Sequence, residues 1–235
     1  MENLENNEQD VNIAENLDID EIKNVLVDYE EYPDKSQKTE EEIADGSGKQ
    51  QQKTILAYLH DFVFGLVGIL LVLMLVFRVV VVSGPSMKQT LKDGDCLILL
   101  GNLFYKEPQP GDIVVASKDS FKDGEPIIKR VIATEGQEVN IDFVSGIVYV
   151  DGVALDEPYT NTPTNLYEGV KFPLIVDEGC VFVMGDNRND SKDSRSHEIG
   201  LIDCREILGK ALFIAFPGAD QESGKREFDR IGALW

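Results

Sequence analysis

The sequence predicts a mainly β protein: an antiparallel β-barrel-like or sandwich-like domain behind one N-terminal transmembrane helix and a disordered acidic tail. Three observations lead to this fold class. The first 48 residues are strongly acidic, a charge-free apolar run follows from Phe62 to Phe77, and short β-branched runs then recur along the chain. Several strands at close spacing without intervening helices favour an antiparallel sheet over an α/β fold.

Residues 1–53 are predicted to be an acidic, disordered tail and linker. Residues 1–48 hold sixteen Asp or Glu and three Lys, which gives −13 of the chain's net charge of −21. Such a segment cannot bury enough apolar surface to offset the entropy lost when it becomes ordered. The rest of the chain is only mildly acidic and has no basic stripe, which argues against nucleic acid as a partner.

Residues 54–82 are predicted to form a transmembrane anchor followed by a juxtamembrane strand. The sixteen residues Phe62–Phe77 carry no charge and span about 24 Å as a helix; the turn before them extends this to a full bilayer span. Arg78 at one end and His60 and Asp61 at the other can each reach an interface. Basic residues flank both ends, so the positive-inside rule does not set the orientation.

Residues 83–217 are predicted to form the β domain, with residues 218–235 as a C-terminal tail. Gly-Asp, Asp-Gly or Pro clusters separate short apolar runs, as is typical of strands joined by turns. Asp151-Gly152 predicts a tight hairpin, and residues 140–173, richer in Pro, Asn and Thr, predict an inserted hairpin with a long loop. The predicted strands are Cys96–Leu100, Asp112–Ala116, Ile127–Ala133, Ile147–Val150, Cys180–Met184 and Ile207–Phe216.

The sequence indicates neither a metal site nor a disulfide framework. Cys96, Cys180 and Cys204 match no CxxC pattern, so we expect small buried side chains there, and the sequence does not give their redox state. The polar loop after Met184 is too poor in carboxylates for calcium, because Arg188 and His197 occupy positions where a calcium loop requires acidic ligands.

A candidate nucleophile lies where a β-branched run ends in a Ser-Gly-Pro-Ser turn, which presents the hydroxyl of Ser86 near the membrane boundary. An activated serine needs a base that is unprotonated at the working pH. One candidate is His197, which would require Asp193 or Asp203 to complete a Ser-His-Asp triad. The other candidate is Lys129, because burial disfavours the ammonium form and leaves a neutral amine.

The strand Ile127–Ala133 decides whether Lys129 is buried. Alternation puts Lys129 on the same face as Val131, and Arg130 on the opposite face. Arg130 cannot serve as a base, because arginine stays charged in proteins. The sequence alone does not tell which of the two faces is the interior one.

Several motifs occur together in a characteristic order, and with them the chain resembles the bacterial type I (leader) signal peptidases over about residues 62–217. The resemblance implies a membrane-anchored serine endopeptidase that removes N-terminal signal peptides from exported preproteins, with its N-terminus in the cytoplasm and its β domain outside. It implies no metal or organic cofactor. The motifs are the anchor, Ser83-Gly84-Pro85-Ser86-Met87, Thr90-Leu91, Gly111-Asp112-Ile113-Val114, Lys129-Arg130-Val131-Ile132, Gly185-Asp186-Asn187-Arg188, Ser191 and Asp193-Ser194-Arg195.

The resemblance also assigns roles to five residues. Ser86 matches the family's nucleophile and Lys129 its general base. Ser191 matches a serine that hydrogen-bonds and orients this lysine. Asp193 and Arg195 match an ion pair that supports the loop.

Two positions depart from the family's pattern. Gln89 stands where the motif usually has proline, which affects the shape of the turn. Gly84 stands where some members carry a hydroxyl residue that stabilises the oxyanion, so we expect the backbone N–H of Ser86 to bear that task. The short insertion near residues 140–173 is more like Gram-positive members.

The expected partners are preproteins with Ala-x-Ala-like cleavage sites and the lipid bilayer. The alternative is a non-catalytic, membrane-anchored β module that binds extended peptides, which predicts Lys129 in solvent and far from Ser86. A self-cleaving repressor of the Ser/Lys type would need a DNA-binding helical head, for which the acidic first 53 residues give no pattern.

Overall fold

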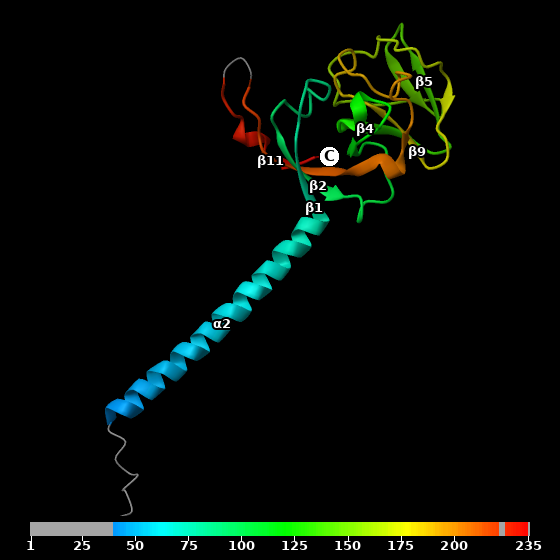
Figure 1. Ribbon diagram of the computed structural model, residues 1–235. Helices are drawn as coiled ribbons and strands as arrows, with labels where there is room; N and C mark the ends of the chain where they lie inside the picture. The colour runs from blue at the N-terminus through cyan, green and yellow to red at the C-terminus, as the bar shows by residue number, and fades with distance from the viewer. Residues whose placement is uncertain (1–39, 221–223, 235) are drawn as a thin grey trace, which may run out of the picture. The chain divides into compact units, whose positions relative to one another are not determined.

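The computed structural model describes residues 40–220 and 224–234 (Figure 1). Its long helix, α2, runs from Glu40 to Val76. Within it, the 24 residues Lys53–Val76 form a candidate membrane span, in which an 18-residue window has a mean hydropathy of 2.5 and is not buried inside the protein. They span about 36 Å, more than the ~30 Å hydrocarbon core. By length and composition, this helix is therefore able to cross a membrane, in agreement with the predicted anchor.

The bounds of α2 differ from the prediction at both ends. The helix begins at Glu40, so residues 45–53, expected to be a linker, are helical; apart from two glycines they are rich in good helix formers. At the other end the apolar run is divided, because strand β1 begins at Phe77 with a β-branched series. The predicted disorder of residues 1–39 lies outside the described residues.

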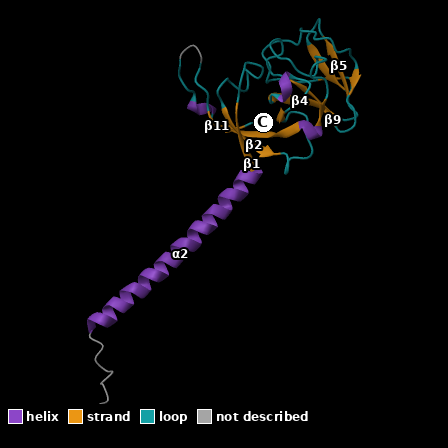
Figure 2. Cartoon of the chain, in the orientation of Figure 1, coloured by secondary structure: helices purple, strands orange, loops and turns teal. Residues whose placement is uncertain are grey.

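The β domain contains an eight-stranded sheet (Figure 2). Its order is β1-β2-β11-β3-β4-β9-β10, with β12 beside β11, and every pairing is antiparallel. The mainly β, antiparallel fold class is therefore confirmed. The strands are β1 Phe77–Val81, β2 Cys96–Gly101, β3 Ile113–Ala116, β4 Ile127–Thr134, β9 Cys180–Met184, β10 Ile202–Asp203, β11 Ile207–Phe216 and β12 Gly232–Ala233.

A second, four-stranded sheet forms the insertion, with the order β7-β6-β5-β8. The predicted hairpin is present, since Val150 pairs with Val153 across a turn in which Asp151 and Gly152 both have positive φ. However, the insertion is a small sheet rather than a hairpin with a loop, because β5 and β8 add to it. The strands are β5 Glu138–Asp142, β6 Ile147–Val150, β7 Val153–Ala154 and β8 Leu174–Ile175.

Three short 3-10 helices complete the described part of the chain: η1 Lys122–Gly124, η2 Cys204–Glu206 and η3 Phe228–Arg230. The last of these lies in the segment predicted to be a tail, and the structure packs that segment onto the domain. Arg230 donates to both carboxylate oxygens of Asp95, at 2.9 and 2.6 Å, and Leu234 packs against the core. Charge pairing and apolar burial therefore make the C-terminal segment part of the fold.

Strand β4 lies inside the eight-stranded sheet, between β3 and β9, and six of its eight residues are buried. The sequence left open which face of this strand is interior, and in the structure both faces are buried. Lys129 and Arg130 are therefore both buried, at 4% and 2% exposure, on opposite faces of one strand. The three cysteines are free thiols and half-buried, which is less burial than predicted.

Candidate active site

The turn that carries Ser86 is built by hydrogen bonds and by two buried anchors. Gly84 has a φ of +90°, which a side chain would strain, and its N–H donates to Asp93 Oδ1 at 2.8 Å. The side chains of Met87 and Leu91 are buried in the core. Ser86, next to one anchor, is therefore held at the surface of the domain with its side chain half-buried.

Lys129 reaches Ser86 from β4, although 43 residues separate them. Its Nζ lies 2.8 Å from Ser86 Oγ, within hydrogen-bond distance. Burial of the amine lowers the pKa of Lys129 to about 8, which the negative charge of Asp193 opposes and the positive charge of Arg195 assists. A substantial fraction of Lys129 is thus neutral near pH 8, so the lysine can accept a proton from the serine hydroxyl.

A buried clamp fixes the turn relative to β4. Arg130 donates to both oxygens of Asp186, at 2.9 and 2.7 Å, and Thr90, four residues beyond Ser86, donates its hydroxyl to Asp186 Oδ2 at 2.5 Å. The Arg130 guanidinium also lies 4.0 Å from the centre of the Tyr159 ring. Because Arg130 is the neighbour of Lys129, the clamp sets the position of the serine turn against the strand that carries the lysine.

The loop after β9 closes onto the same turn. The backbone N–H of Asn187 donates to the carbonyl oxygen of Ser86 at 3.0 Å. Gly185 is packed so closely that a Cβ there would lie 2.5 Å from that carbonyl oxygen and 2.1 Å from Ser191 Oγ. Only glycine fits this position, because any side chain would displace the serine turn or the loop.

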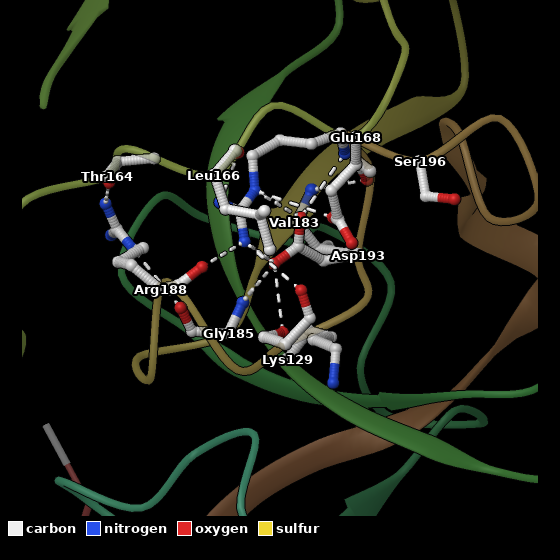
Figure 3. A network of polar contacts seen from close by, with 12 residues as sticks. Lys129, Thr164, Leu166, Glu168, Val183, Gly185, Arg188, Asp193 and Ser196 are labelled. Carbon is white, nitrogen blue, oxygen red and sulfur yellow. Dashed lines mark hydrogen bonds and ion pairs between the residues drawn. The ribbon is translucent and has the colours of Figure 1, made fainter. Parts of the chain in front are cut away.

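Asp193 and Arg195 form the ion pair that the sequence predicted. Arg195 Nε and Nη2 donate to the two oxygens of Asp193 at 2.8 Å each, and all of these groups are buried. Figure 3 shows Lys129 beside the network that contains Asp193 and Gly185. The pair fixes the loop as a rigid unit, since its carboxylate also accepts the N–H of Gly185 at 2.9 Å.

Ser191 differs from the expected geometry. Its hydroxyl donates to Asp193 Oδ2 at 3.0 Å, and among the described residues Lys129 Nζ hydrogen-bonds Ser86 rather than Ser191. The buried carboxylate is the stronger acceptor, because a charge-assisted hydrogen bond outweighs a neutral one. Ser191 therefore lies at the site but orients Asp193 in this structure.

The histidine alternative is not assembled. His197 is exposed, and both carboxylates proposed to assist it are paired with arginines: Asp193 with Arg195, and Asp203 with Arg205. The binding-module alternative is also opposed by the geometry, because it requires Lys129 to be solvated and distant from Ser86. Of the two candidate bases, only Lys129 contacts the serine.

No hydrogen bond donated by the backbone N–H of Ser86 is found among the described residues, so this N–H is available as a donor to a negatively charged oxygen. No hydroxyl is present at Gly84 to add a second donor.

Two acidic residues of the insertion lie at the site without having been predicted. Glu157 binds the buried Arg188 through both oxygens, at 2.8 and 2.5 Å. Glu168 lies next to Asp193 and Arg195. Both occur in long polar connections, where a glutamate is ordinary, so the sequence carries no signal that distinguishes them.

Comparisons with known proteins agree with the motifs. A family model described as signal peptidase, peptidase S26, matches residues 55–216. The probable signal peptidase I-1 of Synechocystis sp. is 39% identical over 146 residues, which cover 59% of this chain and 70% of that protein. Signal peptidase I of Bacillus amyloliquefaciens is 32% identical, over 80% of this chain and 100% of that protein. A crystal structure of a signal peptidase I from Enterococcus faecalis is 29% identical, with a TM-score of 0.37, and covers 45% of this chain and 97% of that one.

The family model covers more than half of the chain, and the Bacillus relative is matched over its full length. The chain therefore belongs to the peptidase S26 family of signal peptidases, as its motifs predicted.

Proposed function

We propose that this member of the peptidase S26 family is a membrane-anchored serine endopeptidase that removes N-terminal signal peptides from exported preproteins, with Ser86 as nucleophile and Lys129 as general base. One observation carries the proposal: Lys129 Nζ lies 2.8 Å from Ser86 Oγ while the lysine is only 4% exposed. The relatives named signal peptidase I support the substrate class.

The chemistry follows from a base that is uncharged in its resting state. Neutral Lys129 removes the proton of Ser86 as Oγ attacks the scissile carbonyl carbon. The backbone N–H of Ser86 donates a hydrogen bond to the oxyanion that forms. The ammonium of Lys129 then protonates the leaving amine, which leaves an acyl-enzyme. Water, activated by the same amine, hydrolyses the ester and restores the serine.

Ser191, Asp193 and Arg195 support this dyad rather than react. The Asp193–Arg195 ion pair keeps the loop rigid, and the Ser191 hydroxyl hydrogen-bonds its carboxylate. The loop in turn holds the carbonyl of Ser86 through Asn187. A nucleophile fixed from both sides reacts with less entropic cost.

We infer that the substrate binds in an extended conformation beside the Ser86 turn, where it would add a strand to the domain. Small side chains at the first and third positions before the cut suit the Ala-x-Ala pattern of signal peptides. The helix within α2 serves as the bilayer anchor, with the N-terminus in the cytoplasm and the β domain outside, where translocated preproteins emerge. Such anchoring restricts the search for substrate to the membrane surface.

Replacement of either member of the dyad tests this function. Ser86→Ala and Lys129→Ala should each abolish cleavage of a preprotein with an Ala-x-Ala site, measured by the appearance of the mature product in detergent. His197→Ala is the matched control and should cleave at the normal rate, because that side chain is exposed and does not contact Ser86. Retained cleavage by Lys129→Ala, or loss of cleavage in His197→Ala, would reject the lysine as base.

A further inference from the structure

The segment that carries Ser86 is closed at its base by two backbone hydrogen bonds and ends in a buried carboxylate. The N–H of Val82 donates to the carbonyl oxygen of Asp95 at 2.8 Å, and the N–H of Gly94 donates to the carbonyl oxygen of Val82 at 2.9 Å. Asp95 has no exposed side-chain surface, and a buried carboxylate needs hydrogen-bond partners. The groups that bind Asp95 therefore determine how this segment is held.

The C-terminal segment supplies partners for this carboxylate. Arg230, in η3, donates from Nη1 to Asp95 Oδ1 at 2.9 Å and from Nη2 to Asp95 Oδ2 at 2.6 Å. The backbone N–H of Gly218 also donates to Oδ1, at 2.8 Å. The N–H of Lys92, which belongs to the serine segment itself, donates to Oδ2 at 2.7 Å. The carboxylate of Asp95 thus joins the C-terminal segment to the segment that carries the serine.

Arg230 also binds the backbone of the serine turn directly. Its Nη2 donates to the carbonyl oxygen of Thr90 at 3.2 Å, four residues after Ser86. The hydroxyl of the same threonine donates to Asp186 Oδ2 at 2.5 Å, within the clamp that Arg130 forms with Asp186. Thr90 is therefore held through its backbone by one arginine and through its side chain by the other.

Close packing accompanies these hydrogen bonds. A Cβ at Gly218 would lie 2.9 Å from the backbone nitrogen of Asp95 and closer still to the carbonyl oxygen of Asp93. Leu234, near the other end of the C-terminal segment, packs against the apolar cluster that contains Met87. The C-terminal segment therefore fits directly against the serine segment, with no room for a side chain at Gly218 between them.

The proposed reaction depends on where this turn is held. Lys129 lies in β4, whose position is set by strand pairing on both sides, whereas Ser86 lies in a turn outside the strands. The 2.8 Å distance between Lys129 Nζ and Ser86 Oγ is therefore set by the contacts of the turn. A displacement of about 1 Å in a catalytic group costs roughly 100-fold in rate.

We propose that Arg230 is a positioning residue, whose guanidinium binds Asp95 and the Thr90 carbonyl and so keeps Ser86 within reach of Lys129. The inference rests on the proposed Ser/Lys peptidase function. Arg230 takes no part in the proton transfer and acts through the serine turn. A lysine could not replace it, because only the planar guanidinium donates several hydrogen bonds in a fixed geometry, while an ammonium acts as a point charge.

Arg230→Lys tests the proposal, because it keeps a positive charge beside Asp95 and removes the forked geometry. The assay uses the full-length chain in detergent with an Ala-x-Ala peptide, at a temperature where circular dichroism shows the variant fully folded. We expect kcat to fall by roughly tenfold or more, because Ser86 is no longer held against Lys129. KM should change by less than about twofold, because binding of the peptide backbone does not depend on the position of Ser86 Oγ.

Arg230→Ala gives a second test through chemical rescue. Millimolar guanidinium, far below denaturing concentrations, should restore much of the lost kcat, since the free ion can bind between Asp95 and the Thr90 carbonyl. The same concentration of sodium chloride should not. A folded Arg230→Ala that guanidinium does not rescue would contradict the proposal, and if this variant does not fold, Arg230→Lys decides.

Glu227→Gln is the matched control. Glu227 lies in the same segment and pairs with Lys92 at 2.8 Å, but the two side chains are 49% and 33% exposed, and such surface pairs contribute little. Its kcat and KM should equal those of the unmodified chain.

A fully folded Arg230→Lys with an unchanged kcat, whatever its melting temperature, would overturn the proposal and leave Arg230 a residue that only stabilises the fold. The same holds if KM rises while kcat is unchanged. If Lys129→Ala still cleaves, the proposed function itself is wrong. An inactive Lys129→Ala together with an unchanged kcat in Arg230→Lys rejects only the role of Arg230.

Discussion

At the scale of single residues, the site depends on an amine placed where its charge is unfavourable. Lys129 lies between the strands of a buried sheet, and burial lowers its pKa from 10.5 to about 8. The folded protein therefore holds the proton less tightly than the unfolded chain does. Below pH 8 this difference lowers the free energy of unfolding by up to about 3 kcal/mol. The loss of stability becomes smaller as the pH rises from 8 towards 10.5.

Lys129→Met should therefore be more stable than the unmodified protein at pH 7. Methionine has a similar length and carries no charge, so the cost of burying a charge is removed. The lost hydrogen bond to Ser86 offsets roughly 1 kcal/mol of this gain in stability. In detergent the melting temperature of the variant should exceed that of the unmodified chain at pH 7, and the gap should narrow at pH 10. If the melting temperature of Lys129→Met were below that of the unmodified chain by the same amount at pH 7 and pH 10, burial of the lysine charge would not lower the stability of the protein.

The sequence predicted that Ser86 and Lys129 belong to one site, and they lie 2.8 Å apart, but it did not give the burial of the lysine. Motif order pointed to this pair, because the order and spacing of the short polar motifs can be read from the chain. Strand alternation could not decide whether Lys129 was buried, because alternation assigns residues to one face or the other and both faces of this strand are buried. Hydrogen-bond choice was likewise beyond the sequence, as Ser191 shows by donating to Asp193.

At the scale of elements, three segments converge on the serine. The turn after β1 presents it, β4 supplies the lysine, and the loop after β9 holds the turn from the other side through Gly185 and Asn187. These segments are distant in sequence, and β11, which comes late in the chain, lies between β2 and β3. The site is therefore assembled only when the sheet is complete.

Gly185→Ala should disable the site through packing alone. The new Cβ would lie 2.5 Å from the Ser86 carbonyl oxygen, and a backbone that must move by about 1 Å costs roughly 100-fold in rate. The measurement is kcat/KM for an Ala-x-Ala peptide.

Gly232→Ala is the control for this change, because a Cβ at Gly232 meets nothing within 4 Å. It should cleave normally. Equal activities of the two alanine variants would show that the contact at Gly185 does not fix the serine.

Among the elements, the long apolar strands were predictable and the polar ones were not. Ile147–Val150, Cys180–Met184 and Ile207–Phe216 have the predicted bounds, because continuous apolar runs between turn residues carry a strong signal. β5 was missed, since Glu138, Asn140 and Asp142 face solvent and dilute its two buried positions. The two-residue strands β8, β10 and β12 have no pattern of their own and form only as partners of longer strands.

At the scale of the whole molecule, an apolar helix and a β domain follow each other closely. Ten positions separate Val76, where α2 ends, from Ser86, and extended chain covers at most about 3.5 Å per residue. The proposed nucleophile is therefore tethered within a short distance of the anchor's end. This short tether suits the proposed substrate, a preprotein that emerges from the membrane.

The central claim is that a buried lysine, and no histidine, activates Ser86. The most direct test is the pH dependence of kcat/KM for the full-length chain in detergent with an Ala-x-Ala peptide, because its acidic limb reports the base of the free enzyme. We predict a limb near pH 8, the value to which burial lowers the pKa of Lys129, and no change in His197→Ala. A limb near 6.5, the ordinary range of histidine, that vanishes in His197→Ala would contradict the Ser/Lys mechanism.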